Sequence, residues 1–499
     1  MARVPSQMWL LGLAALCACN AENCEEEPLC IPYAPDTLTG ATGGGTPTGT
    51  GDAGATADGG GGQGGTGGTS AGTATGTATG TATGTGGMGG MTGLGGMGGG
   101  ANLLQLGGMG GVAMGAGGNA AADPPVATRP CARGVRAAVT HSCAARGDGS
   151  IFCWGAGDVG QLGQGTKADS SLPVRVSNVV DAVAFDTYGL HGCAVRGSDD
   201  MLWCWGDNGA GQLGDPALPN SPAPIQRTNL EAVKGVAVGS ATGGGYTCAL
   251  DGSRIRCFGA GTSGVLGYGQ DNDTVVPLEV LGLKAAVNMD AQGRHACALL
   301  AGGALTCWGQ NDKGQLGNLL TIDQNVPVQV SAVTSATAVT VGNEHTCAIV
   351  AQGRVKCWGA HDRGQLGDGS MQDYSPQARD VMGLLGVVEV GAGFKHTCAR
   401  RRTGTVHCWG ANDRGQLGNA AMGEDLFAPA PVAVTEIGPD FGRSAVALSV
   451  GHSHACALMT DDTVWCWGAN DARQLGDGTD IDRPFPVQVR DLFASNEDE

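Results

Sequence analysis

Short stretches of alternating apolar and polar residues recur from about residue 131 onward. In one example, residues 337–342, 345–350 and 354–358 alternate, are rich in β-branched side chains and are separated by glycine-containing turns. A polar loop and another short apolar segment follow in most repeats, as at 327–330 and 486–489. Alternation over five or six residues bounded by glycine is typical of strands in an antiparallel sheet. The pattern therefore predicts four short strands in about every 50 residues.

The unit repeats seven times. Each copy contains Cys-Trp-Gly or a close variant, followed by Gly-Gln-Leu-Gly or a close variant. The aromatic residue after the cysteine is, in order, Trp154, Trp205, Phe258, Trp308, Trp358, Trp409 and Trp467. Steps of 51, 53, 50, 50, 51 and 58 residues separate them. Seven groups of four strands predict an all-β, seven-bladed propeller. We expect the last strand, near 486–489, to join the blade that residues 135–154 begin, and so to fasten the ring.

Composition divides the chain into four parts. Glycine makes up 91 of the 499 residues, and many glycines precede residue 123 in runs with threonine, alanine and methionine. Such a segment buries too little apolar surface to offset its ordering entropy, so we expect a disordered tether. The predicted domains are a signal peptide (1–18), an anchored N-terminus with a low-complexity linker (19–128), the propeller (129–495) and an acidic tail (496–499).

The N-terminus resembles an export signal. An apolar run from Met8 to Leu16 is too short to span a bilayer but suits a secretory signal. It ends in Leu-Cys-Ala-Cys, which resembles a bacterial lipobox and makes Cys19 the expected lipidation site. The alternative is ordinary cleavage and secretion without a lipid. We therefore expect the bacterial cell envelope, with the chain either lipid-anchored at the outer membrane or secreted.

Cysteine usage also favours export. Of 19 cysteines, 14 form seven pairs that each flank one predicted hairpin turn: Cys143 with Cys153, Cys193 with Cys204, Cys248 with Cys257, Cys297 with Cys307, Cys347 with Cys357, Cys398 with Cys408 and Cys456 with Cys466. Residues equidistant from a hairpin turn face each other across the two strands, so each pair is predicted to form a disulfide. Cys24 and Cys30 have the spacing to pair, which leaves Cys131 as an odd cysteine.

A histidine precedes the first cysteine by two residues in six repeats: His141, His191, His295, His345, His396 and His454, with Tyr246 in the third. One histidine and two cysteines raise the question of zinc, but no fourth ligand or Cys-x-x-Cys spacing accompanies them. We expect a structural hydrogen-bonding residue, with no metal and no cofactor. The Gly-Gln-Leu-Gly segments lack the helix and Lys-Ser/Thr of a phosphate-binding loop, so we expect their glycines in turns and their leucine in the core. We expect the tryptophan of Cys-Trp-Gly to be a wedge between blades.

These motifs resemble a known family. His-Thr-Cys-Ala, Cys-Trp-Gly-Ala-Asn-Asp-x-Gly-Gln-Leu-Gly and Pro-x-x-Val look like the repeat of the regulator of chromosome condensation family over about residues 131–495. The resemblance implies a seven-bladed propeller. It implies function weakly, because the family includes a nuclear nucleotide-exchange factor, a plant UV photoreceptor and a secreted β-lactamase inhibitor. The photoreceptor's Gly-Trp-Arg-His-Thr pattern is absent here.

The loops after Gly-Gln-Leu-Gly are polar, variable and acidic. The candidate binding face consists of Asp271, Asp273, Asp373, Glu424, Asp425, Asp477, Asp480 and Asp482. A solubilising surface and a docking face for a basic protein are both compatible with these acids. Calcium at residues 477–482 is a third alternative, without a recognisable loop signature. Because the net charge is −18, nucleic acid is not an expected partner.

The sequence thus predicts a surface-anchored, monomeric scaffold that binds a protein through loops on one face and touches the membrane only by its lipid. It predicts no catalytic residue, because the off-pattern His361 and His407 both stand alone. The alternatives are a hydrolase or lyase with a site in the central channel, or guanine-nucleotide exchange implied only by the family resemblance.

Overall fold

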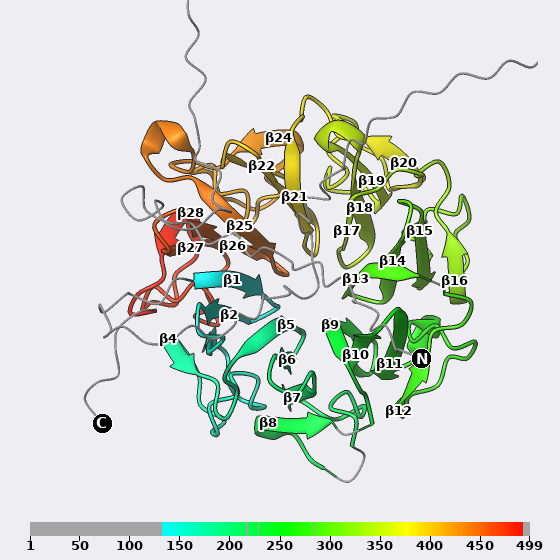
Figure 1. Ribbon diagram of the computed structural model, residues 1–499. Helices are drawn as coiled ribbons and strands as arrows, with labels where there is room; N and C mark the ends of the chain where they lie inside the picture. Colours follow the sequence, from blue (N-terminus) through cyan, green and yellow to red (C-terminus); the bar gives the residue numbers. More distant parts are fainter. Residues whose placement is uncertain (1–131, 216–217, 228, 284, 493–499) are drawn as a thin grey trace, which may run out of the picture. The chain divides into compact units, whose positions relative to one another are not determined.

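The computed structural model describes residues 132–492 except 216–217, 228 and 284. Within them, seven four-stranded antiparallel sheets stand as blades around a central channel (Figure 1). The predicted seven-bladed, all-β propeller is therefore confirmed. The predictions for the signal peptide, Cys19, the linker, Cys24, Cys30, Cys131 and the acidic tail fall outside the described residues.

Each blade uses four consecutive strands, ordered from the channel outward. Blades 1 and 2 contain β1 (Ala132–Ala137), β2 (His141–Arg146), β3 (Ile151–Gly155), β4 (Ser170–Arg175), β5 (Ala182–Tyr188), β6 (His191–Arg196), β7 (Leu202–Gly206) and β8 (Ser221–Arg227). Blades 3 and 4 contain β9 (Val233–Ala241), β10 (Gly244–Asp251), β11 (Arg254–Gly259), β12 (Thr274–Glu279), β13 (Ala286–Gln292), β14 (His295–Leu300), β15 (Leu305–Gly309) and β16 (Gln324–Gln329).

Blades 5 and 6 contain β17 (Ala338–Val341), β18 (His345–Val350), β19 (Arg354–Ala360), β20 (Tyr374–Asp380), β21 (Val387–Ala392), β22 (His396–Arg401), β23 (Val406–Ala411) and β24 (Phe427–Ala433). Blade 7 contains β25 (Ala445–Val450), β26 (His454–Met459), β27 (Val464–Gly468) and β28 (Arg483–Gln488). The short 3-10 turns are η1 (Thr262–Gly264), η2 (Ala351–Gly353) and η3 (Pro439–Phe441). None of the described helices is long and apolar enough to cross a bilayer.

The predicted closure of the ring by strand exchange is wrong. β28 pairs with β27 of its own blade, with Val487 opposite Cys466. The outer place in blade 1 is taken by β4, where Val174 lies opposite Cys153, so no edge there is open to the last strand. Blades 7 and 1 instead meet through cross-blade hydrogen bonds such as Ala137 N to Ser449 Oγ at 2.9 Å.

The predicted cysteine pairs are confirmed as disulfides between the second and third strands of each blade. Paired cysteines are direct cross-strand neighbours, as Cys347 and Cys357 are, with Cα atoms 4.1 Å apart. All fourteen are buried, so each disulfide holds a hairpin at the centre of its blade, next to the apolar core between blades. The seven disulfides join Cys143 to Cys153, Cys193 to Cys204, Cys248 to Cys257, Cys297 to Cys307, Cys347 to Cys357, Cys398 to Cys408 and Cys456 to Cys466.

Proline protects the outer edge of the blades. Val489 N donates to Val464 O at 2.8 Å, so the position three residues earlier faces away from the sheet, and that position is Pro486. Six of the seven blades have proline at the matching place: Pro173, Pro224, Pro277, Pro327, Pro431 and Pro486. Since proline has no N–H, these edges lack a donor for pairing with a further strand. In six blades, pairing of the outer edge with a further strand is therefore disfavoured.

Candidate functional site: one face of loops

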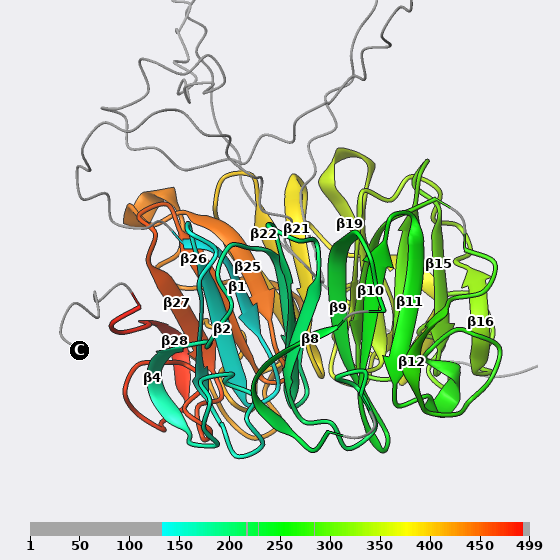
Figure 2. The ribbon, with the colours of Figure 1, turned by 60° about the horizontal axis from the view of Figure 1, so that its bottom comes forward.

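Strand alternation assigns the connections to two faces. First-to-second and third-to-fourth strand connections lie on one face, because β1 and β3 run in the same direction, and the other connections lie on the opposite face. We call the first of these the loop face; its long connections lie along the lower edge of Figure 2. The described chain enters β1 from the opposite face and leaves β28 on it as well. The loop face is therefore free of both ends of the described chain.

The Gly-Gln-Leu-Gly segment returns from the loop face into the space between blades. Leu366 is buried, and a Cβ on Gly367 would stand 2.6 Å from Trp409 Nε1 of the next blade. Trp409 Nε1 donates to Gln365 O at 2.9 Å. The same bond recurs for every other tryptophan of the set, whereas Phe258 has no donor. Leucine and tryptophan therefore join neighbouring blades, as we expected.

The loops themselves are built around a buried amide. Asn311 Oδ1 accepts from Leu316 N at 3.0 Å, and its Nδ2 donates to Leu320 O and Ile322 O. His361 replaces this asparagine in blade 5, where Nδ1 faces Leu366 N and Nε2 lies 3.0 Å from Asp368 Oδ1. The off-pattern histidine thus holds a loop in shape, as asparagine does in other blades.

The recurring histidines of the second strands have a structural use. His295 Nε2 lies 2.7 Å from Thr346 Oγ1 of the next blade, and that hydroxyl donates to Gln315 O at 2.8 Å. Because the hydroxyl uses its proton for the carbonyl, the histidine donates Nε2–H to it. Equivalent bonds link His191 to Thr247, His345 to Thr397 and His454 to Ser142. The last of these also joins blade 7 to blade 1.

Three of these links are missing because the next blade has no hydroxyl at this position. His141 turns to Thr187 Oγ1, and Tyr246 donates to His295 O at 3.0 Å. His396, facing Ala455, has no hydrogen-bond partner on either ring nitrogen among the described residues. All of these side chains are buried, and the described part of the chain contains no group of three or more His, Cys, Asp or Glu residues placed to hold a metal.

Several acids of the predicted face close their own loops. Asp273 Oδ1 accepts from Gly261 N at 2.9 Å, and Asp482 Oδ1 accepts from Asn470 N at 2.7 Å. Asp169 and Asp323 make the same bond twelve residues back in their loops. In these four loops the acid closes the loop, as Asn220 does in blade 2, so its presence in the sequence says little about a partner.

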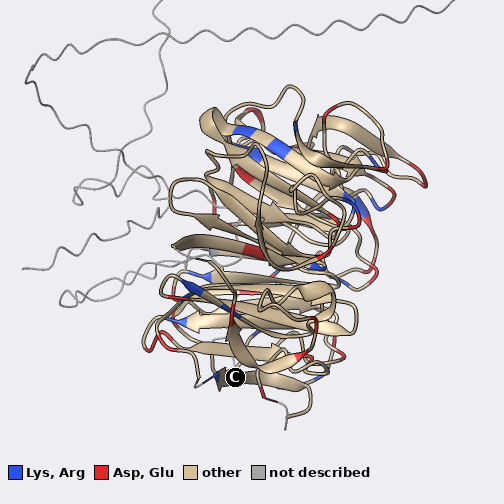
Figure 3. Cartoon of the chain, turned by 90° about the vertical axis from the view of Figure 1, so that its right-hand side faces the viewer, with Lys and Arg blue, Asp and Glu red and all other residues tan. Residues whose placement is uncertain are grey.

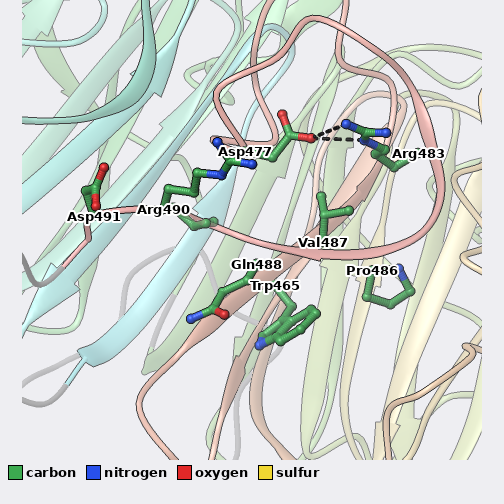
Figure 4. A pocket seen from close by; sticks show the side chains of 9 residues that line it. Trp465, Asp477, Arg483, Pro486, Val487, Gln488, Arg490 and Asp491 are labelled. Carbon is green, nitrogen blue, oxygen red and sulfur yellow. Dashed lines mark hydrogen bonds and ion pairs between the residues drawn. The ribbon is translucent and has the colours of Figure 1, made fainter.

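Other acids are neutralised by arginine. Arg363 Nη1 lies 2.9 Å from Asp425 Oδ1 of the next blade, and Arg414 pairs in the same way with Asp482. Asp477 is only 5% exposed and pairs with Arg483, 2.9 Å from Nη2 (Figure 4). Asp477 therefore cannot present its carboxylate to a partner, and it must be removed from the predicted binding face. The pairing with Arg483 also neutralises the carboxylate that a calcium ion would need.

Four members of the predicted face are exposed and have no side-chain partner among the described residues: Asp271, Asp373, Glu424 and Asp480. They lie on four different blades. Figure 3 shows acidic and basic positions side by side on the loops at its right-hand side. The loop face is thus less negative than the count of acids suggested, with free carboxylates at separate points.

Sequence reasoning missed a polar cluster in the channel. The innermost residues opposite the first cysteine of each blade are Arg136, Asp186, Ala237, Asp290, Thr340, Gly391 and Ser449. In six blades this residue stands seven before the cysteine, so an alignment of the repeats would have shown two aspartates and an arginine there. They line a cavity of about 30 Å³. A space of this size holds about one water molecule.

The channel acids also join blades. Asp186 Oδ1 lies 3.2 Å from Arg136 Nε, and Asp186 Oδ2 accepts from Val238 N at 2.8 Å. Asp290 Oδ2 accepts from Val341 N at 2.7 Å. Burial raises the pKa of Asp186 to about 7, although Arg136 opposes the shift, and burial raises the pKa of Asp290 to about 6. These carboxylates bind groups of neighbouring blades, and the cavity beside them leaves little room for a substrate.

A shallow groove of about 580 Å³ lies on the outer wall of blade 7 (Figure 4). Trp465, Val487 and Arg490 line it, and the Asp477–Arg483 pair lies at its rim. Arg443 stacks on Trp465, with its guanidinium carbon 3.9 Å from the ring centroid. The groove is wide and open, and the Asp477–Arg483 charges beside β28 are already paired.

Exposed apolar residues are the second feature that sequence reasoning missed. The third-to-fourth strand connections and outer strands of blades 4 to 7 expose ten large apolar side chains: Leu319, Leu320, Ile322, Met371, Tyr374, Met422, Leu426, Phe427, Ile481 and Phe485. Their excess in four blades was visible in the loop sequences, but their exposure was not, because the same loops bury leucines in the core.

Two models of the regulator of chromosome condensation (RCC1) repeat match the chain. One matches residues 148–185, 303–349, 352–400, 403–458 and 461–496, and the other matches 336–365, 387–416 and 445–474. Together with the blade structure, these matches identify the chain as a seven-bladed propeller built from RCC1 repeats. The family resemblance predicted from the sequence is confirmed.

Proteins of different kinds are similar in sequence to this chain. Ultraviolet-B receptor UVR8 of Arabidopsis thaliana is 28% identical over 367 residues, which cover 72% of this chain and 81% of the receptor. E3 ubiquitin-protein ligase HERC2 of Homo sapiens is 30% identical over 346 residues, which cover 68% of this chain but 6% of the ligase. The chain therefore matches a small part of the ligase and most of the receptor.

Solved structures show the same fold. Prp20p of Saccharomyces cerevisiae is 21% identical, with a TM-score of 0.59 over 69% of this chain and 86% of that one. Human WBSCR16 is 18% identical, with a TM-score of 0.57 over 68% of this chain and 93% of that one. At these identities the likeness establishes the propeller and leaves function to the loops.

Proposed function

We propose that this chain is a non-catalytic binding protein of the bacterial envelope, anchored by a lipid on Cys19, whose loop face holds a protein partner. The observation that carries the proposal is a contrast within the molecule. The repeated histidines, tryptophans and cysteines are buried in contacts within and between blades, whereas the loop face differs from blade to blade. Variable loops on a rigid scaffold are the usual place for recognition.

The relatives support a binding role. Two solved structures of this fold are yeast RCC1 (Prp20) bound to Kap60, and Prp20p, which has binding properties to Gsp1p and histones. A channel enzyme is less favoured, because the channel cavity of about 30 Å³ is smaller than any ordinary substrate. Protein binding by the face of a propeller needs no such cavity.

The test uses the exported form of the chain with Cys19→Ala, so that no lipid is attached. The protein is immobilised and exposed to envelope extract and to growth medium at low and moderate salt, and retained proteins are identified by mass spectrometry. We expect one protein to be retained and then lost when Asp373, Glu424 and Asp480 are changed to lysine. Retention of nothing by the unchanged chain would refute the proposal.

A matched control reverses three exposed acids on the opposite face: Glu231→Lys, Asp440→Lys and Asp491→Lys. This variant carries the same change in net charge but leaves the loop face intact, so it should retain the partner. Equal loss in both variants would show that overall charge, rather than the loop face, governs binding. The anchor is tested separately by radiolabelled palmitate, whose incorporation should require Cys19.

A further inference from the structure

The exposed apolar side chains of the loop face are concentrated in blades 4 to 7. Ile322 is 66% exposed and Ile481 is 57% exposed, each two residues before the outer strand; we call the exposed apolar residues of these connections the apolar tips. Phe427 opens the outer strand of blade 6 with 40% of its surface exposed. Exposure of such large apolar side chains to water is unfavourable, and the free energy falls when a partner covers them.

Blades 1 to 3 provide an internal control. They have the same repeat and the same buried leucine, yet their described third-to-fourth strand connections and outer strands expose only Leu218 and Val276 among large apolar residues, and Leu190 adds one more from a first-to-second connection. The fold of the repeat therefore does not require apolar loop tips. Their presence in four consecutive blades has to be explained by something outside the ring.

The four loops form a continuous strip because successive blades touch at this level. Gly369 N donates to Pro429 O at 2.9 Å, and Ala420 N donates to Pro484 O at 2.8 Å. A Cβ on Gly314 would stand 2.5 Å from Pro376, which places the loop of blade 4 against the outer strand of blade 5. The apolar tips are therefore neighbours along the rim of the ring.

Free carboxylates are interleaved with these tips. Asp373 stands beside Tyr374, Glu424 lies within three residues of Phe427, and Asp480 precedes Ile481. No described residue pairs with any of these three carboxylates, whereas Asp425 and Asp482 in the same loops are held by arginine. A ligand that covers the apolar tips must also meet three uncompensated negative charges, one on each of blades 5 to 7.

We propose that the strip over blades 4 to 7 binds a cationic amphipathic helix of a protein partner, with its apolar side on the loop tips and its lysines or arginines at Asp373, Glu424 and Asp480. This rests on the proposed function and specifies the partner. An anionic lipid surface fits less well, since the carboxylates among the tips would repel it. A second copy of this acidic strip would meet the same repulsion.

The test measures fluorescence anisotropy of an 18-residue labelled peptide with leucine on one helical side and lysine on the other. The exported chain with Cys19→Ala should bind it, and should not bind peptides in which glutamate replaces lysine or serine replaces leucine. Changing Leu320, Ile322 and Phe427 to serine should weaken binding roughly a hundredfold, since each side chain has about half its surface left to bury.

The matched control, Leu218→Ser with Val276→Ser, removes exposed apolar side chains from blades 2 and 3 and should leave binding unchanged. Neutralising the acids (Asp373→Asn, Glu424→Gln, Asp480→Asn) should weaken binding roughly tenfold at low salt and less at high salt. Circular dichroism checks that each variant keeps the fold. No binding of the leucine–lysine peptide, or equal loss in the control, would overturn the proposal.

Two other occupants are decided in the same series. Binding to phosphatidylethanolamine–phosphatidylglycerol vesicles that disappears in the serine variant would overturn the proposal in favour of a membrane surface. A dimer in sedimentation that the same variant dissociates would overturn it in favour of a second copy. If the extract experiment retains a partner but the peptide does not bind, the helix proposal fails while protein binding stands.

Discussion

Acid should unfold this propeller through the buried histidines of its second strands. Burial lowers the pKa of His141 to about 4 and the pKa of His345 to about 3, and it lowers the pKa of His191, His295, His396 and His454 to about 3 as well. In the unfolded chain each would titrate near 6.5. As the pH falls below 6.5, the unfolded state therefore takes up protons that the folded state excludes. Stability from this source is complete above pH 6.5 and is lost towards pH 3–4.

Two channel acids act in the opposite direction. The raised pKa values of Asp186, about 7, and Asp290, about 6, mean that the folded state holds two extra protons near pH 5. Near pH 5 the unfolded state binds six more histidine protons and the folded state two more aspartate protons, so the net difference is about four. Each proton of this difference changes the free energy of unfolding by about 1.4 kcal/mol per pH unit. The free energy of unfolding should thus fall by about 5 kcal/mol per pH unit around pH 5. For a chain of this size the melting temperature should fall by roughly 7 °C per unit.

The measurement is a series of thermal melts of the exported chain between pH 7.5 and 4.5 without reducing agent, followed by near-UV circular dichroism. His345→Gln removes one titrating group but keeps a donor for Thr397, so the slope should fall by about a quarter. His407→Gln is the control: His407 lies outside the second-strand set and is only partly buried, so burial lowers its pKa less than that of His345 and the slope should change less. A melting temperature that stays constant from pH 6.5 to 4.5 would refute the reasoning, as would equal slopes for the wild type and His345→Gln.

Three further predictions concern stability at neutral pH, each read from thermal melts. Replacing Cys347 and Cys357 together by alanine should cost about 2–3 kcal/mol, because it releases a ten-residue hairpin loop in the unfolded chain. Arg473→Gly should stabilise the fold by about 1 kcal/mol, because residue 473 has φ of +65° where six other blades have glycine, and its ion pair is exposed. Asp186→Ala should cost about 3 kcal/mol or more, because it removes the ion-pair partner of the buried guanidinium of Arg136 and the acceptor of Val238 N.

Each of these outcomes has a clear opposite. A melting temperature unchanged in the double cysteine variant would mean that the hairpin is already constrained in the unfolded chain. A lower melting temperature for Arg473→Gly would mean that the ion pair outweighs the relief of backbone strain. Tolerance of Asp186→Ala would mean that water compensates Arg136 in the channel.

The repeat indicated in advance where the buried elements lie. Alternating residues around each cysteine pair predicted the hairpins, and the fifty-residue period predicted seven blades, because strands of period two need a partner sheet and identical units stack with the same geometry. The positions of the wedge tryptophans and structural histidines also followed from their recurrence. Residues that recur in the units have structural roles here, so the internal repeats of a single sequence reveal the fold.

The repeat pattern did not predict how the ring closes or which carboxylates remain unpaired. Whether β28 completes blade 7 or blade 1 depends on which edge is already filled, and the weakly patterned β4 decided that. The acids of the loops looked alike in the sequence, yet Asp477 is buried against Arg483 and Asp480 is free.

Local alternation and spacing were enough to specify the repeat, its strands, its disulfides and its blade count. The folded ring was needed to establish how the propeller closes, which carboxylates remain unpaired, and that the apolar loop tips form one strip. These features depend on contacts between neighbouring blades about fifty residues apart, where the identity of one residue gives no information about the side chain that faces it.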